Sequence, residues 1–174
     1  MALSVGQRWE NPRTGTSMEV IAPNEVRRVI KPGKGKLQAH YGPDYVERFV
    51  VESGRAQARK GRRRLELGPG EELVLQPGEP HVNPYNRDDE DLVFRQSAEP
   101  LVPFVQAFVN TYGACLDADR TDRQDELPLL AVFGVASKVE IPSYAAGIPR
   151  SLQRGVALPI GAALARRRGY AVHA

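Results

Sequence analysis

The sequence predicts a mainly β domain followed by a helical extension. From Leu37 to Arg95, apolar and polar residues alternate with a period of two, and Gly- and Pro-containing turns separate the segments. After Glu99-Pro100 the period changes to about 3.6 residues, which is typical of amphipathic helices. We therefore expect an amino-terminal arm over residues 1–14, a β domain over residues 15–99 and a helical extension over residues 100–174.

Composition favours a folded domain in a reducing compartment. The chain has 174 residues, of which 41% are hydrophobic, and this is enough for a core. The net charge of +3 indicates neither nucleic acid nor membrane partners by itself. The single cysteine, Cys115, cannot form an internal disulfide, and we expect it to be structural. The chain starts without the apolar core of a signal peptide, so a cytoplasmic location is expected.

No integral membrane segment is expected. The longest uninterrupted run of apolar, Gly or Pro residues extends from Val156 to Ala165. This run is about half of the roughly 20 residues that a membrane-spanning helix needs.

Two short strands are predicted after the turn-rich arm. They lie on either side of the turn Pro23-Asn24, and each alternates apolar with polar residues. Their apolar residues are Met18 and Val20 before the turn, then Val26, Val29 and Ile30 after it.

The next two segments bring charged and imidazole side chains onto inward faces. Gln38 and His40 share one face of the first segment, and a Gly42-Pro43-Asp44 turn follows. Every second residue from 45 to 51 then shares one face of the following strand. If His40 and Glu47 face inward, the companions of Glu47 do so too, namely Tyr45, Phe49 and Val51.

The rest of the β domain reads as a hairpin and three further strands, giving about eight strands up to Arg95. Residues 55–67 alternate Ala or Leu with charged residues, which predicts a hairpin with a polar outer face. Leu73–Leu75 is an apolar strand, and a Pro77–Pro80 turn delivers His81 to the start of the next strand. Residues 92–95 close the sheet region.

Three helices are predicted in the extension. The first follows Leu101 to Tyr112, the second Leu127 to Val139 and the third Arg150 to Arg168, with a linker over 143–149. Pro159 is expected to kink the last helix. The apolar residues along one side of that helix are Leu152, Val156, Ile160, Ala163 and Leu164.

Two motifs carry a family resemblance. His40 is followed seven residues later by Glu47 and seven further on by Gly54, and a Gly70-Glu71-Glu72 to Pro80-His81 run comes after them. This pattern resembles the two signature motifs of the cupin superfamily over residues 15–97. The resemblance implies a single double-stranded β-helix, or jelly-roll, barrel around a pocket that often holds a metal. The tail resembles that of bacterial cupin-domain proteins without an assigned reaction.

The motifs depart from the cupin pattern at three places. The second histidine of the expected His-x-His pair is Gly42, which removes one nitrogen donor. The Pro of the second motif is shifted next to Gly78. Tyr85 stands where the pattern has Asn, and Asn86 comes one place late.

The candidate catalytic and metal-binding residues are His40, Glu47 and His81. Two imidazoles and a carboxylate can bind a divalent ion such as Fe, Mn, Ni or Zn and leave positions open for a substrate. Without metal, Glu47 could act as a general base whose pKa an apolar pocket raises. The alternative is structural: hydrogen bonds satisfy the histidines, and an inward Arg or Tyr pairs with Glu47.

Five further residues are candidates for substrate binding. The rings of Tyr45, Phe49 and Tyr85 could stack on an organic substrate, with Gln38 and Asn83 on the segments that carry the two histidines. The alternative for the aromatic residues is plain barrel core.

The function predicted is that of a cupin-type enzyme on a small organic molecule, for which a polyketide-like or enolisable carbonyl compound is one substrate class. Oxidation, isomerisation or cyclisation are the candidate reactions, assisted by the metal. The alternative is a non-catalytic binding or sensor module without metal. The expected partners are a small molecule and a second copy in a homodimer.

Nucleic acid is not expected as a partner. The basic cluster from Arg59 to Arg64 is read as a solvated hairpin, because no aromatic residues interleave with it. Arg166 to Arg168 complement the dipole of the last helix, and contact of that helix with a membrane surface is an alternative.

Overall fold

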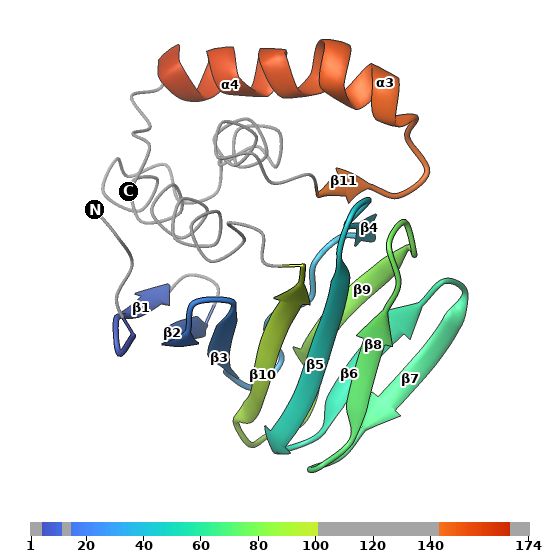
Figure 1. Ribbon diagram of the computed structural model, residues 1–174. Coiled ribbons are helices and arrows are strands. Elements are labelled where there is room, and N and C mark those ends of the chain that lie inside the picture. Colours follow the sequence, from blue (N-terminus) through green and yellow to red (C-terminus); the bar gives the residue numbers. More distant parts are fainter. Residues whose placement is uncertain (1–4, 12–14, 101–142, 168–174) are drawn as a thin grey trace.

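The computed structural model describes residues 5–11, 15–100 and 143–167, and this part of the chain is mainly β (Figure 1). Two antiparallel sheets face each other, with strand orders β1-β2-β3-β10-β5-β8 and β11-β4-β9-β6-β7. The expected mainly β fold, a barrel of two antiparallel sheets with a helix at the carboxyl-terminal side, is confirmed. The strands are β1 (Arg8–Asn11), β2 (Thr16–Ala22), β3 (Glu25–Ile30), β4 (His40–Tyr41), β5 (Val46–Ser53), β6 (Ala56–Lys60), β7 (Arg63–Leu67), β8 (Glu72–Leu75), β9 (His81–Asn86), β10 (Leu92–Glu99) and β11 (Tyr144–Ala145).

The period-two pattern places the core where the sequence predicts it. In β5, Glu47, Phe49 and Val51 are buried, and the residues between them are less so. The rings of Phe49 and Phe94 meet edge to face with centroids 5.8 Å apart, which joins β5 to its neighbour β10. The core cluster consists of Ile30, Phe49, Val51, Ala56, Ala58, Leu67, Leu73, Leu75, Leu92 and Phe94.

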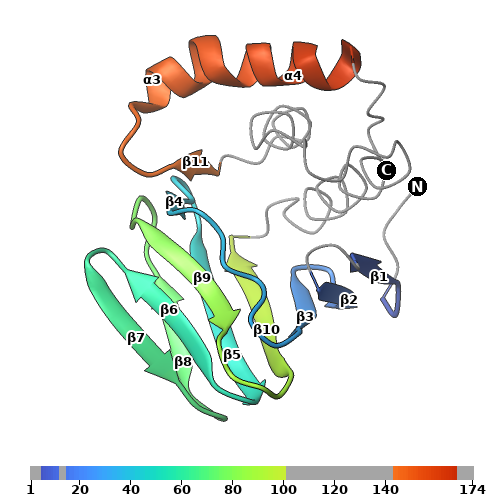
Figure 2. The ribbon, with the colours of Figure 1, turned by 180° about the vertical axis from the view of Figure 1, so that it is seen from behind.

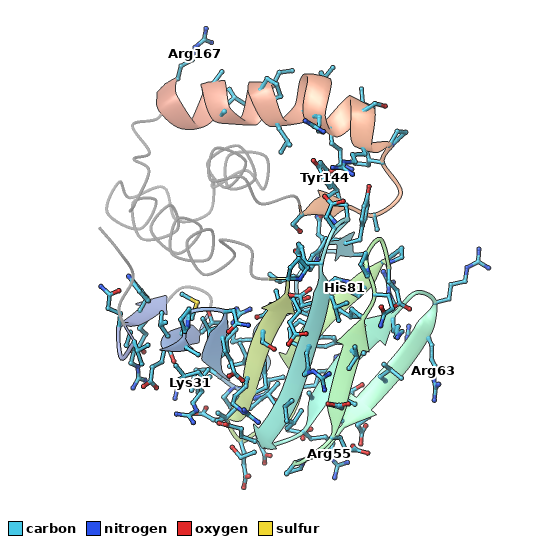
Figure 3. The ribbon with its side chains drawn as sticks, in the orientation of Figure 1. Lys31, Arg55, Arg63, His81, Tyr144 and Arg167 are labelled. Atoms are coloured by element: carbon cyan, nitrogen blue, oxygen red, sulfur yellow. The ribbon has the colours of Figure 1, made fainter. Side chains whose placement is uncertain are left out.

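The barrel interior changes from apolar to polar along the strands. Phe49 and Val51, in the second half of β5, belong to the apolar core, whereas Glu47 near the start of the strand does not. Figure 3 shows His81 at the end of the barrel nearer the carboxyl-terminal helix and Arg55 at the opposite end. The interior therefore has an apolar end and a polar end.

A bulge in β9 explains why Asn86 comes one place late. The register pairs Gln57 with Tyr85 but Arg59 with Val82, so β9 has one residue more than β6 over this stretch. Asn86 consequently pairs with the buried Ala56 and is itself buried. Its amide donates to the carbonyls of Ile30 at 3.0 Å and Glu90 at 2.6 Å, and its side-chain oxygen accepts from the backbone N–H of Asp88.

The tail returns to the polar end of the barrel. The segment expected as a linker contains β11, which pairs with β4 and brings Ala145 opposite His40. A helix follows, composed of α3 (Arg150–Leu152), the π-helical turn η2 (Gln153–Ala157) and α4 (Leu158–Arg167), and it is seen from the other side in Figure 2. The π turn ends where the N–H of Leu158 bonds to the carbonyl of Gln153. Pro159, which lacks an N–H, comes directly after this irregularity.

The predictions for the amino-terminal arm and for the first two helices of the extension are compared with the structure in turn. The amino-terminal arm carries a strand, because Arg8–Asn11 pairs with Thr16–Glu19. The helices predicted over residues 101–112 and 127–139, and Cys115, lie outside the described residues.

Replacing Asn86 with Ala should destabilise the barrel by about 1–3 kcal/mol, because the buried carbonyl of Ile30 then loses its hydrogen-bond donor. Urea unfolding followed by circular dichroism measures the change. Arg87→Ala, on the exposed neighbour, is the control and should leave the midpoint within experimental error. Equal midpoints for both variants would contradict this role of Asn86.

Candidate functional site

The two predicted histidines meet at the polar end of the barrel. His40 in β4 and His81 in β9 are register partners, and their ring centroids are 4.5 Å apart with an interplanar angle of 59°. His81 is buried, with 1% of its surface exposed, whereas His40 is half-buried. His40 is therefore the more accessible of the two imidazoles.

Both imidazoles are oriented in the same way. His40 Nδ1 lies 2.8 Å from the carbonyl oxygen of Gln38, and His81 Nδ1 lies 3.0 Å from that of Glu79. A carbonyl oxygen can only accept, so each Nδ1 carries a proton. Nε2 is then the ring nitrogen that takes part in chemistry on each histidine.

Glu47 connects the histidines to the opposite sheet. Its Oε2 lies 3.3 Å from His81 Nε2, and its Oε1 accepts a hydrogen bond of 2.5 Å from Gln96 Nε2. Gln96 Oε1 in turn accepts from a terminal nitrogen of Arg28 at 3.4 Å. The contact between His81 and Glu47 is an ion pair without the geometry of a hydrogen bond, so His81 Nε2 has no hydrogen-bond partner. A polar row thus crosses the barrel from β3 to β4.

The pKa shifts indicate an ionised pair. Burial alone would raise the pKa of Glu47, but its contacts with His81, His40 and Gln96 outweigh burial and lower that pKa. The expectation of a raised pKa was therefore wrong, because it left these contacts out. Burial opposes the charge on His81, yet Glu47 raises its pKa. Burial and the charge on His81 together lower the pKa of His40.

These directions favour one form of each group. They favour the carboxylate of Glu47, the imidazolium of His81 and the neutral imidazole of His40, with the His40 proton on Nδ1. The site therefore places a proton donor and a proton acceptor side by side.

Tyr45 occupies the space that a side chain at position 42 would need. A Cβ added to Gly42 would clash with Cζ of the Tyr45 ring, far inside van der Waals contact. Tyr45 is buried, and burial followed by the charge of Glu47 raises the pKa of its phenol. Gly42 and Tyr45 thus form a matched pair: a histidine at position 42 and the present ring position exclude each other.

The other substrate-binding candidates separate into different environments. Phe49 lies in the apolar core, away from the polar row. Asn83 is buried, and its side-chain oxygen has no hydrogen-bond partner in the described part of the chain. Its side chain contributes to the raised pKa of His81. The side chain of Gln38 is exposed, and it is its backbone that contacts His40.

Tyr85 is turned away by the bulge in β9. Its neighbour Asn86 pairs with inward Ala56, so Tyr85 points to the other face of the strand. Its ring lies 5.7 Å from the cationic groups of Lys36 and Arg87. The period-two pattern alone placed Tyr85 with His81, because it contained no bulge.

Sequence reasoning did not single out Gln96 and Arg28. Gln96 is fully buried between Phe94 and Ala98 on the inward face of β10, and Arg28 is buried between Val26 and Ile30. Polar residues at inward positions of alternating strands were the available signal.

The donor types fit a divalent metal, but their arrangement does not. Neutral imidazoles with a free Nε2 are ordinary metal ligands. However, no group of three or more His, Cys, Asp or Glu in the described residues is arranged to hold an ion, and Glu47 is engaged by His81 and Gln96. The Tyr45 ring also occupies the side from which the ligand missing at Gly42 would come. No step proposed below depends on a metal.

Comparisons with known proteins concern the fold. No family model matches the sequence, and no curated protein matches it. Two opposed antiparallel sheets are the barrel architecture that the cupin resemblance implies, and His40 and His81 lie on neighbouring strands within it.

Similar solved structures include three bacterial proteins. A predicted oxalate decarboxylase from Thermotoga maritima is 18% identical, with a TM-score of 0.45, over 54% of this chain and 90% of that one. A protein with a double-stranded β-helix domain from Klebsiella pneumoniae is 22% identical, with a TM-score of 0.42, over 57% and 83%. A cupin-superfamily sugar phosphate isomerase from Silicibacter pomeroyi is 18% identical, with a TM-score of 0.42, over 51% and 62%. These likenesses do not identify a reaction for this chain.

The Glu47–His81 pair should make stability depend on pH with a definite sign. The raised pKa of His81 stabilises the fold below its ordinary value of 6.5, and this contribution is lost as the pH rises through the folded value. The lowered pKa of Glu47 stabilises the fold above its ordinary value of 4.5, and this contribution is lost as the pH falls through the folded value.

The stability difference between wild type and Glu47→Gln should therefore be largest between the two ordinary pKa values, 4.5 and 6.5, and should shrink at lower and at higher pH. Urea unfolding at a series of pH values measures this difference. Glu52→Gln, on an exposed ion pair with Arg27, serves as control. A difference that is constant from pH 4 to 9 would argue against an ionised pair.

Proposed function

We propose that the polar end of the barrel binds a small organic molecule with an enolisable carbonyl and moves a proton on it, giving isomerisation or cyclisation. The observation that carries this proposal is the buried Glu47–His81 pair, 3.3 Å apart, beside a half-buried and neutral His40. The two imidazoles, His81 favouring the protonated form and His40 the neutral form, are suited to general acid–base catalysis.

Each residue has a distinct role in this chemistry. His40 Nε2 removes the proton from the carbon next to the carbonyl, because His40 is neutral and accessible. His81 donates its Nε2 proton to the carbonyl oxygen, since that N–H is not committed to a hydrogen bond. Where the deprotonated carbon carries a hydroxyl group, His40 then delivers its proton to the former carbonyl carbon and that hydroxyl passes its proton to His81, so that the carbonyl moves by one carbon and both histidines are restored.

Glu47 acts through His81. Its carboxylate favours the imidazolium, while Gln96 and Arg28 fix the carboxylate from the other side. The side chain of Asn83 acts on His81 and the charge of Glu47 acts on Tyr45, so both residues lie at this end of the barrel, which supports their assignment as binding residues. A cytoplasmic location, the homodimer and the absence of nucleic acid partners remain predictions.

Proton transfer is testable before the substrate is known. Enolisable carbonyl compounds incubated with the protein in deuterium oxide should gain deuterium next to the carbonyl, as followed by NMR. His40→Asn and His81→Asn should each slow this exchange by about 100-fold or more. Glu52→Gln should not. If compounds bind and perturb the barrel signals but never exchange, the chain is a binding or sensor module and the catalytic proposal fails.

A divalent metal held by His40, Glu47 and His81 is the second candidate, supported by the two Nε2 atoms that the backbone contacts leave available. Elemental analysis of protein purified without chelator separates the two candidates. The acid–base proposal predicts less than stoichiometric metal and exchange that survives chelation. Stoichiometric metal that is lost in both His40→Ala and His81→Ala would overturn it in favour of the metal site.

A further inference from the structure

The segment that ends in the carboxyl-terminal helix presents an apolar stripe that no described part of the chain covers. Ile148, Leu152, Val156 and Ile160 follow one another at four-residue intervals, and each keeps between 46% and 51% of its surface exposed. The other exposed large hydrophobic residues among those described are Val5 at 64% and Leu37 at 44%. The sequence predicted Leu152, Val156 and Ile160 on one side of the helix, and the structure leaves these three exposed.

The same segment carries positive charge only. From residue 148 to residue 174 the sequence has five arginines and no Asp, Glu or Lys. Arg154 is exposed and lies between Leu152 and Val156 in the sequence, and Arg167 points away from the body of the protein at the far end of α4 (Figure 3). Apolar side chains bordered by cations, without acidic residues, are typical of helices that lie in the interface of an anionic membrane.

A second copy of this chain is a less suitable occupant. In a two-fold symmetric dimer the segment would meet its own copy, whose charged residues are likewise arginines only. No acidic residue within the segment could neutralise them. Anionic lipid headgroups supply the complementary charge that the segment itself lacks.

The helix is firmly attached to the barrel. The Gln153 side chain is buried and bonds to both the N–H and the carbonyl of Ala145, and to the carbonyl of Ile148. Arg150 stacks over the Tyr144 ring at 5.0 Å and lies 3.5 Å from Asp44. These contacts occupy the side toward β11 and leave the stripe outward. In the described part of the chain no helix has the length and apolar content needed to cross a membrane.

We propose that residues 148–167 form a membrane-surface helix that binds anionic lipid, with Leu152, Val156 and Ile160 inserted among the acyl chains and Arg154 and Arg167 at the headgroups. Binding holds the polar end of the barrel near the membrane, because β11 connects this helix to β4 and His40. This proposal is independent of the reaction proposed above.

Vesicle flotation with the full-length chain tests the proposal. The protein should float with vesicles of phosphatidylcholine mixed with phosphatidylglycerol, much less with phosphatidylcholine alone, and less as salt increases. The double variant Leu152→Ser and Val156→Ser should bind at least about tenfold more weakly. Leu37→Ser, at an exposed aliphatic residue of the barrel, should bind like wild type.

Charge is tested with a matched pair of variants. Arg154→Glu in the helix should weaken binding to the mixed vesicles, whereas Arg62→Glu in the β6–β7 turn makes the same change of net charge and should not. Circular dichroism of each variant confirms that the fold is retained. Equal losses of vesicle binding for Arg154→Glu and Arg62→Glu would show that only the net charge matters, and would overturn the proposal. So would wild-type protein that ignores anionic vesicles but loses a dimer, measured by light scattering, when the stripe is changed to serine.

Discussion

The ion pair of Glu47 and His81 is the constraint on which the polar end of the barrel depends. A carboxylate with 6% of its surface exposed is stable only when charge and hydrogen bonds replace the water it has lost. His81 supplies the charge and Gln96 the hydrogen bond, and Gln96 is held by Arg28. Removing one partner of such a buried pair typically costs about 3–5 kcal/mol. Polar residues therefore surround the pair, whereas apolar side chains such as Phe49, Leu92 and Phe94 fill the other end of the barrel.

Two local features of the backbone deliver this arrangement. The bulge in β9 lets His81 face Glu47 while Asn86, five residues later, fixes the loop that leads into β10. The short strand β11 pairs with β4 and so holds the strand that carries His40. The site is consequently supported by segments from both ends of the sequence.

Much of the fold could be predicted from the sequence, and the site only in part. Alternation in residues 45–51 places Glu47 inward, because this pattern is local, whereas the meeting of His40 and His81 is what the cupin resemblance implies. The displacement of Tyr85 depends on a bulge that has no single-residue signature. The pKa of Glu47 depends on Gln96, which is 49 residues away and reaches Glu47 only through strand pairing. The sequence likewise does not indicate that the Tyr45 ring fills the space beside Gly42, because this depends on the three-dimensional path of the turn.

The protonation states of the histidines decide between an acid–base site and a metal site. With three histidines in the chain, long-range 1H–15N NMR spectra at neutral pH can resolve each ring. We predict both nitrogens of His81 protonated and His40 neutral with its proton on Nδ1, and we predict that Glu47→Gln lowers the pKa of His81. A wild-type His81 that is neutral at pH 6, with a bare Nε2 and a pKa unmoved by Glu47→Gln, would contradict the ionised pair.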